Sequence, residues 1–314
     1  MTPSRIKPPA LRPGDTVGVV NPAAAVEREH LERGVNVLAS MGLRVKVSDR
    51  ALARDGILAG DDRDRARELM GFFADEEVRA IFCARGGYGC GRLLPLLDFA
   101  AIARRPKVFV GFSDATFLLN PLIERCGMVA FHGPMVAMDL AHVRTDRSLD
   151  HMRRLLCGDM PSFELEARET VHGGVAEGEL FGGCLSVLAA MLGTPYAPDF
   201  AGRILFLEDT GERAYRIDRM LVQLRQAGAF ARAAGIVFGA IRPVDGSEQE
   251  SRLIARFIAE QTADLGIPVI SGIEAGHGTE NLALPFGVRV RIDGARRRIA
   301  FLESPVSRAR AERG

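Results

Sequence analysis

The chain has 314 residues, which is enough for two domains that each bury a core. Hydrophobic residues make up 47% and charged residues 26% of the sequence, as is typical of globular proteins, and 41 Lys and Arg oppose 40 Asp and Glu. The resulting net charge of +1 excludes a general electrostatic attraction to nucleic acid or to anionic membranes.

Cysteine and histidine usage argues against disulfides and metal sites. The five cysteines are an odd set without a C-x-x-C pair, and no two histidines show the spacing of metal ligands. The first residues lack an apolar signal region, and no run approaches the roughly 18 apolar residues of a membrane-spanning helix. The sequence therefore predicts a cytoplasmic protein without a metal.

The first half of the chain alternates short apolar runs with amphipathic segments, the pattern of parallel strands joined by crossover helices. It predicts a doubly wound α/β domain over residues 1–160, whose ligands bind at the carboxyl ends of the strands. The predicted strands are 16–21, 44–48, 78–83 and a run ending at 111, and the predicted helices are 27–41, 61–74, 93–97 and a segment after 113.

The second half, residues 161–314, predicts a smaller α/β domain with a mixed sheet. Between 146 and 172 the periodic pattern weakens, and 170–174 has loop composition, so we place the boundary near 160. The predicted strands are 203–208, 235–239, 288–292 and 298–302, the last two forming a half-exposed hairpin, and the predicted helices are 214–227 and 248–264.

Ser113 stands directly after an apolar run and before a helix-like segment, in the pattern Gly-x-Ser-x-Ala. This is the layout of a nucleophile elbow, where the serine hydroxyl stands clear of the sheet and the next amide, that of Asp114, can face an oxyanion. Serine also favours the N-cap of a helix. Both interpretations of Ser113 are open from the sequence alone.

A glycine-rich turn, Arg-Gly-Gly-Tyr-Gly-Cys-Gly at 85–91, follows another predicted strand. Its glycines do not match G-x-G-x-x-G, and no Walker lysine follows, so a dinucleotide or P-loop site is excluded. The turn suits a second oxyanion donor, the amide of Gly86 or Gly87, although a purely structural turn is the alternative.

Glu208 and Asp209 end a later apolar run, and His277 lies between two glycines. Adjacent side chains on a strand point to opposite faces, so only one carboxylate can approach His277, and spacing does not say which. A surface histidine and a helix-capping carboxylate are the alternatives. We interpret His132, in His-Gly-Pro, as part of a loop-shaping element.

In chain order, these features resemble the LD-carboxypeptidases, serine peptidases that include muramoyl-tetrapeptide carboxypeptidases and microcin immunity peptidases. The motifs are weak singly and specific as an ordered set. They are Pro-Gly-Asp at 13–15, Leu-Ala-Gly at 58–60, Arg-Gly-Gly-Tyr-Gly at 85–89, Gly-Phe-Ser-Asp at 111–114, His-Gly-Pro at 132–134, Gly-Gly at 182–183, Gly-Thr-Pro at 193–195, Ile-Leu-Phe-Leu-Glu-Asp at 204–209, Tyr-Arg-Ile-Asp-Arg at 215–219 and Gly-His at 276–277.

The resemblance implies a triad in which Ser113 attacks, His277 transfers the proton and Glu208, not Asp209, orients the imidazole. It implies a flavodoxin-like, glutamine-amidotransferase-like N-terminal domain that carries the serine and a C-terminal domain that carries the other two, with the site between them. Homodimers are usual in such proteins.

The resemblance also places an oxyanion hole at the backbone of Asp114 and of Gly86 and Gly87. One departure concerns the family motif Gly-Gly-Asn-Leu, where this chain has Cys184 in place of asparagine. Cysteine lacks the amide's donors and acceptor, so a substrate contact made there is lost or rearranged. Candidate substrate-binding residues are Cys184, Arg85 and Tyr88, although Arg85 could instead brace its loop.

The resulting hypothesis is a hydrolase that needs no cofactor and releases D-alanine from an L-centre of a murein tetrapeptide, or a related muropeptide, in peptidoglycan recycling. A microcin-type immunity peptidase acting on an aminoacyl-nucleotide analogue is an alternative, disfavoured because the chain has no Trp and three Tyr to stack on a base. The third hypothesis is a non-catalytic peptide-binding protein.

Overall fold

The computed structural model describes residues 5–142 and 146–308, which form two compact units. The first contains the described residues up to Pro161, together with Leu282–Pro285 and the described residues from Ser304 onward; the second contains Ser162–Asn281 and Phe286–Glu303. The two later segments that belong to the first unit, Leu282–Pro285 and the residues from Ser304, are held there by hydrogen bonds. A ring nitrogen of His151 lies 2.9 Å from the Ala283 oxygen. The sequence does not predict that these two segments of the second half join the first unit.

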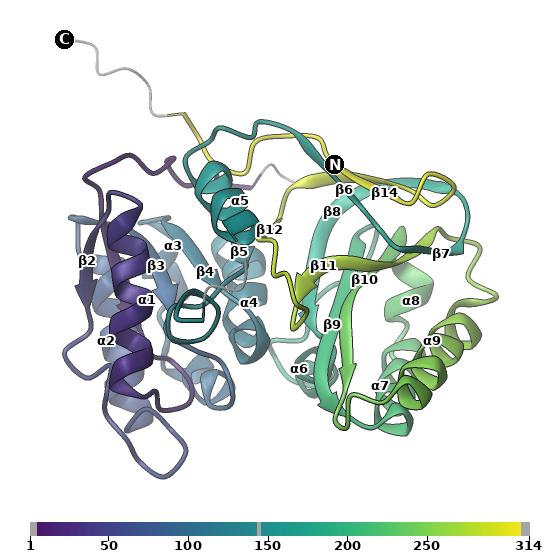
Figure 1. Ribbon diagram of the computed structural model, residues 1–314, viewed down its shortest axis with the longest axis horizontal. Coiled ribbons are helices and arrows are strands. Elements are labelled where there is room, and N and C mark those ends of the chain that lie inside the picture. Colours follow the sequence, from purple (N-terminus) through teal and green to yellow (C-terminus); the bar gives the residue numbers. More distant parts are fainter. Residues whose placement is uncertain (1–4, 143–145, 309–314) are drawn as a thin grey trace. The chain divides into compact units, whose positions relative to one another are not determined.

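The first unit is built on a six-stranded sheet in the order β12-β5-β4-β3-β1-β2 (Figure 1). The pairs from β2 through β5 are all parallel, which confirms the doubly wound prediction. Strands β1 and β4 are wholly buried, as expected for apolar strands covered on both faces. The bounds are β1 (Thr16–Val20), β2 (Arg44–Val47), β3 (Val78–Cys83), β4 (Val108–Gly111), β5 (Ala130–His132) and β12 (Leu284–Phe286).

Helices α1, α2 and α4 form where the sequence predicts helices. Helix α2 begins after Asp61, whose side chain accepts the amide hydrogen of Arg63 at 2.8 Å. The segment predicted as a helix at 93–97 is instead a 3₁₀ turn, Cys90–Leu96, which contains Pro95. The bounds are α1 (Arg28–Ser40), α2 (Asp62–Ala74), α3 (Phe99–Ala103), α4 (Thr116–Cys126) and α5 (Asp146–Leu156).

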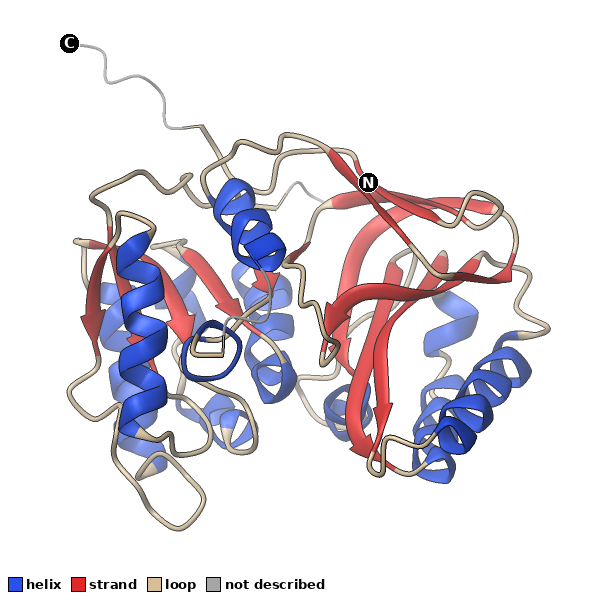
Figure 2. Cartoon of the chain, viewed as in Figure 1, coloured by secondary structure: helices blue, strands red, loops and turns tan. Residues whose placement is uncertain are grey.

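The second unit is an eight-stranded mixed sheet in the order β6-β14-β13-β8-β9-β10-β11-β7 (Figure 2). Its central strands β8, β9, β10 and β11 are parallel, and antiparallel strands flank them, so the mixed-sheet prediction is confirmed. The bounds are β6 (Phe163–Glu166), β7 (Glu169–His172), β8 (Val175–Cys184), β9 (Ile204–Glu212), β10 (Gly235–Pro243), β11 (Val269–Gly276), β13 (Arg289–Asp293) and β14 (Arg298–Phe301).

Four helices accompany this sheet: α6 (Leu185–Met191), α7 (Ala214–Gln226), α8 (Ala229–Arg232) and α9 (Glu248–Thr262). Helices α7 and α9 lie side by side and are joined where Gln261 donates to Asp218 at 3.0 Å (Figure 1). Strands β8 and β11 end at Cys184 and Gly276, and Glu208 lies within β9, opposite Cys184 in the register. The carboxyl ends of parallel strands form the edge where such sheets place functional side chains.

Two elements form where the sequence shows only a weak periodic pattern, between 146 and 172, and the second contradicts the loop composition of 170–174. Helix α5 forms there, burying Met152, Leu155 and Leu156, and residues 169–172 form strand β7 on an edge of the second sheet.

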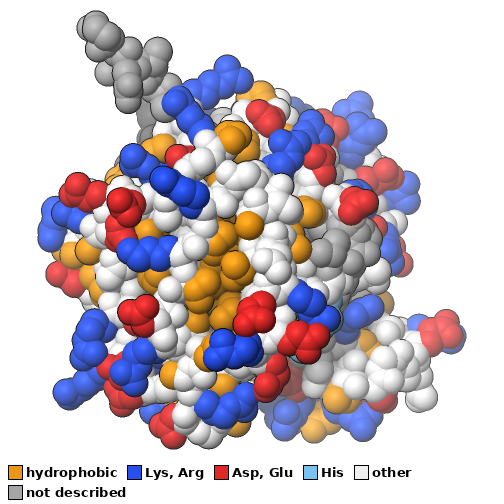
Figure 3. Space-filling model, turned by 60° about the vertical axis from the view of Figure 1, so that its left-hand side comes forward, with side chains coloured by type: hydrophobic (Ala, Val, Ile, Leu, Met, Phe, Trp, Pro, Cys, Tyr) orange, Lys and Arg blue, Asp and Glu red, His pale blue; other side chains and the backbone are white. Residues whose placement is uncertain are grey.

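Charged side chains of both signs are interspersed on the face shown in Figure 3. Among the described residues, no helix has the length and apolar character needed to cross a membrane.

Candidate active site

Ser113 occupies a strained backbone position at the carboxyl end of β4. Its φ is +60°, one of two positive values at non-glycine residues in the described chain. It begins a 3₁₀ turn that leads into α4, and the residue at the N-cap of α4 is Ala115, so Ser113 does not cap that helix. Its side chain is partly exposed. The local geometry is therefore that of an elbow.

The glycine-rich turn lies directly against this elbow. A Cβ added to Gly86 would lie 2.9 Å from the Ser113 Cβ, 3.1 Å from its Oγ and 3.2 Å from the Asp114 nitrogen. Only glycine permits this approach. Gly87 follows with a φ of +98°. The turn's backbone thus stands beside both the serine hydroxyl and the next amide.

Two candidate substrate-binding residues on this turn differ in their surroundings. The Arg85 guanidinium donates to the Ala25 oxygen at 3.0 Å, the loop-bracing contact that the sequence left as an alternative. Tyr88 is 51% exposed. A substrate contact by either residue stays a prediction.

In the second unit, Glu208 and His277 are joined by a short hydrogen bond. The His277 Nδ1 lies 2.6 Å from the Glu208 Oε2, and the same oxygen accepts the His277 backbone amide at 3.1 Å. Glu208 is fully buried on β9, and His277 directly follows β11. Two bonds from one residue to one oxygen fix the imidazole relative to the carboxylate and leave Nε2 as its other proton-transfer atom.

Gly276 makes room for this pair. A Cβ at position 276 would lie 2.4 Å from the Glu208 Oε2, and φ there is +89°. The Gly276 amide donates to the Asn281 Oδ1 at 2.9 Å, so a buried asparagine holds the loop that presents the histidine. Sequence reasoning did not identify Asn281, because a lone asparagine in a loop carries no distinguishing signal.

Asp209 points away from the histidine and has a different role. Its Oδ2 accepts the amide hydrogen of Ser186 at 2.7 Å, in the first turn of α6, and its Oδ1 accepts that of Thr210 at 2.7 Å. Burial, followed by the charge of Glu208, raises the pKa of Asp209 to about 6. The two adjacent carboxylates therefore have opposite directions, as the strand alternation predicts.

Cys184 lies beside Glu208, its register partner across the β8–β9 pair. It is 4% exposed, and its Sγ lies 3.3 Å from the Ser186 hydroxyl. Burial raises the pKa of the Cys184 thiol well above its usual value, so a thiolate nucleophile is not available there. Its predicted contact with substrate stays a prediction.

The interpretation of His132 as a loop element is wrong. It lies on strand β5, is fully buried, and packs edge-on to Phe112 with ring centroids 5.5 Å apart. In the part of the chain that the structure describes, no group of three or more His, Cys, Asp or Glu residues is arranged to hold a metal ion.

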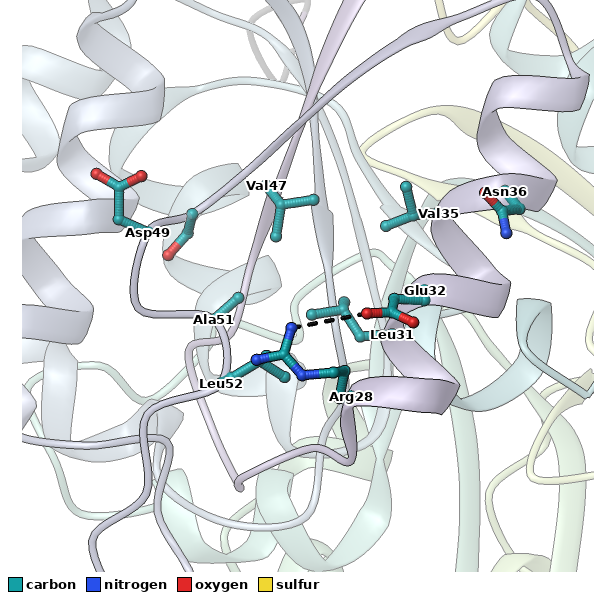
Figure 4. A pocket seen from close by; sticks show the side chains of 10 residues that line it. Arg28, Leu31, Glu32, Val35, Asn36, Val47, Asp49, Ala51 and Leu52 are labelled. Atoms are coloured by element: carbon teal, nitrogen blue, oxygen red, sulfur yellow. Dashed lines mark ion pairs between the residues drawn. The ribbon is translucent and has the colours of Figure 1, made fainter.

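A cavity of about 450 Å³ lies elsewhere in the first unit, between α1 and the end of β2 (Figure 4). Its apolar lining includes Leu31, Val35 and Val47, and the exposed Arg28–Glu32 ion pair at 3.6 Å lies at its edge. None of the predicted site residues lines this cavity.

Comparison with protein families gives two matches that cover most of the chain. Residues 17–133 match the LD-carboxypeptidase N-terminal domain, and residues 177–292 match the LD-carboxypeptidase C-terminal domain. The chain belongs to the LD-carboxypeptidase family. This confirms the resemblance inferred from the ordered motifs, and it makes the protein a hydrolase of the carboxypeptidase class within a serine peptidase family.

Individual LD-carboxypeptidase relatives align along nearly the full chain. A Bacillus subtilis strain 168 protein named "Probable murein peptide carboxypeptidase" is 37% identical over 96% of this chain and 95% of the relative. The crystal structure of muramoyltetrapeptide carboxypeptidase from Oxalobacter formigenes is 31% identical, with a TM-score of 0.81 over 91% of this chain and 97% of that one. An MccF-like protein from Bacillus anthracis strain Ames is 28% identical, with a TM-score of 0.86 over 95% of this chain and 99% of that one.

Proposed function

We propose that the protein is a serine LD-carboxypeptidase that releases a C-terminal D-amino acid, D-alanine, from an L-centre of a murein tetrapeptide or related muropeptide. The observation that carries the proposal is the buried Glu208 carboxylate held 2.6 Å from the His277 Nδ1 in a chain of this family. The names of the Bacillus and Oxalobacter relatives support a murein peptide as substrate.

In the proposed mechanism, Ser113 attacks the carbonyl carbon of the L-configured residue while His277 accepts the hydroxyl proton. The tetrahedral intermediate collapses, and D-alanine leaves with a proton from His277. Water then attacks the acyl-enzyme with His277 as general base, which restores the serine. Glu208 keeps the imidazole in one tautomer and stabilises its protonated form.

The oxyanion would be stabilised by the amides of Asp114 and of Gly86 or Gly87. Support comes from the contact between Gly86 and the elbow, since an added Cβ would lie 3.1 Å from the Ser113 Oγ. Preorganised backbone donors of this kind typically contribute about 10²-fold or more to kcat each. No cofactor takes part in this scheme.

The proposal is tested by incubating the purified protein with murein tetrapeptide and measuring D-alanine by mass spectrometry. We expect release by the wild type and a rate lower by about 10⁵- to 10⁶-fold in Ser113→Ala, with an unchanged circular dichroism spectrum. Undiminished release by folded Ser113→Ala would remove Ser113 from the nucleophile role.

A second candidate function is that of a microcin-type immunity peptidase, supported by the likeness to the MccF-like protein. An aminoacyl sulfamoyl adenosine, offered beside the tetrapeptide, separates the two functions by the ratio of kcat/KM values. We expect the tetrapeptide to be the better substrate, because the chain has no Trp to stack on a base.

A third candidate is a peptide-binding protein without catalysis, which predicts saturable tetrapeptide binding and no labelling of Ser113 by a serine-directed phosphonate.

For the hydrolase we further propose a cytoplasmic location and a homodimer, as the family resemblance implies. Light scattering coupled to gel filtration tests the dimer, and fractionation of the source cells tests the compartment.

A further inference from the structure

The side chain of Asp114 holds the far end of the glycine-rich turn. Asp114 is 4% exposed, and its Oδ2 accepts the amide hydrogen of Cys90 at 2.7 Å. Its own amide nitrogen stands beside Gly86 at the near end, 3.2 Å from the position of an added Cβ. One residue next to Ser113 therefore contacts the turn twice, through its backbone and through its carboxylate.

Arg65, from helix α2, contacts the same end of the turn as the Asp114 carboxylate. Arg65 is 2% exposed, and its guanidinium donates from Nη1 to the Gly89 oxygen at 3.1 Å and also to the Pro22 oxygen. Its Nη2 donates to Asp62. A Cβ added to Gly89 would lie 2.7 Å from the Arg65 Nη1, so the guanidinium packs directly on the backbone.

These two contacts meet on one peptide group. The Gly89 oxygen and the Cys90 nitrogen belong to the same peptide group. Its oxygen accepts a hydrogen bond from Arg65, and its N–H donates one to Asp114. Burial raises the pKa of Asp114, whereas the Cys90 amide and the charge of Arg65 oppose that shift. Two buried side chains, Arg65 and Asp114, thus hold one peptide group of the turn, and their burial carries a desolvation cost.

The turn needs such a restraint because of its composition. Three glycines lie within residues 86–89, and Gly87 and Gly89 adopt φ values of +98° and +132°. Glycine has more conformational freedom than any other residue, so an unrestrained turn would present its amides in many directions. Oxyanion stabilisation requires donors whose direction is set before the reaction.

We propose that Arg65 and the Asp114 carboxylate are positioning residues that clamp the Gly89–Cys90 peptide and thereby aim the turn's amides at the oxyanion formed on Ser113. The inference rests on the proposed function, since the oxyanion donors belong to that mechanism. It adds two side chains, neither of which touches the reacting atoms, to the machinery of the site.

The test measures kcat and KM for tetrapeptide, with kcat expressed per Ser113 titrated by a fluorophosphonate. We expect Asp114→Asn and Arg65→Met each to lower kcat by about tenfold to a hundredfold with KM within about twofold, because misplaced donors affect the transition state more than substrate binding. Arg65→Lys, which keeps one cationic donor, should recover part of the loss.

The matched control is Asp98→Asn, since Asp98 is also a carboxylate that accepts one backbone amide, that of Ala101 at 2.9 Å, but at the start of α3. It should leave kcat per titrated serine unchanged. Unchanged kcat per titrated serine in folded Asp114→Asn or Arg65→Met would overturn the clamp, as would an equal loss in Asp98→Asn.

The rate of fluorophosphonate labelling separates this inference from the proposed function. If the wild type labels at Ser113 but does not hydrolyse tetrapeptide, the substrate assignment fails, and slower labelling of the two clamp variants still supports the clamp. Equal labelling rates in wild type and variants would contradict it. A wild type that neither labels nor hydrolyses removes both proposals.

Discussion

The nucleophile region and the acid–base region are organised by different means. Around Ser113 the geometry is set by the backbone: a residue held at a φ of +60°, with Gly86 packed against it. Around His277 it is set by side chains, because a fully buried carboxylate fixes the imidazole through two hydrogen bonds. The first arrangement centres on backbone conformation and the second on a hydrogen-bonded pair of side chains, so they should respond to different substitutions.

Among the substitutions that compare the two regions, the largest effect is expected from neutralising the carboxylate of the acid–base pair. Glu208→Gln should lower kcat by about 10³- to 10⁴-fold, because an amide does not favour the productive imidazole tautomer or stabilise its charge. The steady-state rate on tetrapeptide measures this loss. Asp209→Asn is the matched control next to it on β9, and its kcat should stay within about tenfold of wild type. Equal losses of kcat in both variants would contradict the assignment of different roles to Glu208 and Asp209.

A smaller loss is expected from filling the space beside Glu208. Gly276→Ala introduces a Cβ 2.4 Å from the Glu208 Oε2 at a φ of +89°, so we expect about a 10²-fold fall in kcat and a free energy of unfolding lower by about 2 kcal/mol. Urea denaturation and tetrapeptide turnover measure the two effects.

The control is Gly71→Ala, in helix α2, where an added Cβ has nothing within 4 Å. It should raise stability by about 0.5–1 kcal/mol and leave kcat unchanged. Wild-type turnover by Gly276→Ala would show that steric room at this loop is not a condition for the Glu208–His277 pair.

Asp209 should make stability depend on pH. Its folded pKa of about 6 lies above the unfolded value near 3.9, so the folded state binds the extra proton between these values. Its contribution to stability is present below about pH 4 and is lost as pH rises through 6, a change of about 3 kcal/mol. Urea denaturation from pH 4 to 7.5 should show a shallower decline in Asp209→Asn than in wild type, and parallel curves would contradict this role.

The smallest effect is expected at Cys184. Replacing it with asparagine, as in the family motif Gly-Gly-Asn-Leu, should change KM for tetrapeptide by about threefold to tenfold with kcat nearly constant. Because the site is 4% exposed, the amide should also lower the free energy of unfolding by about 1–2 kcal/mol. An unchanged KM in the folded variant would exclude a substrate contact at this position.

The sequence predicts the regular strands and helices well where the apolar pattern is strong. Strand β3 and helix α2 begin and end within one residue of expectation, because buried parallel strands and capped helices carry local signals. The sequence does not predict helix α5, because this segment is mostly polar, or strand β7, because four residues on a sheet edge carry little pattern. The 3₁₀ turn at Cys90–Leu96 replaces the predicted helix around Pro95.

The residues of the candidate site can likewise be predicted from the sequence only in part. The turn, the elbow serine and the flanked histidine can be recognised because they are local patterns. Which of Glu208 and Asp209 meets His277 cannot be read from spacing, since it depends on the face of the sheet that His277 reaches after β11. The contacts of Asn281 and Arg65 depend on segments brought together by folding, so no local pattern reveals them.

The most direct test of the account is a double-mutant cycle on kcat with tetrapeptide, comprising Ser113→Ala, His277→Ala and the combined variant. If the two residues act as one catalytic unit, the combined variant should be no slower than either single variant, because each substitution already removes the whole acyl-transfer route. Losses that multiply in the combined variant would show that the serine and the histidine act independently and would contradict the proposed triad.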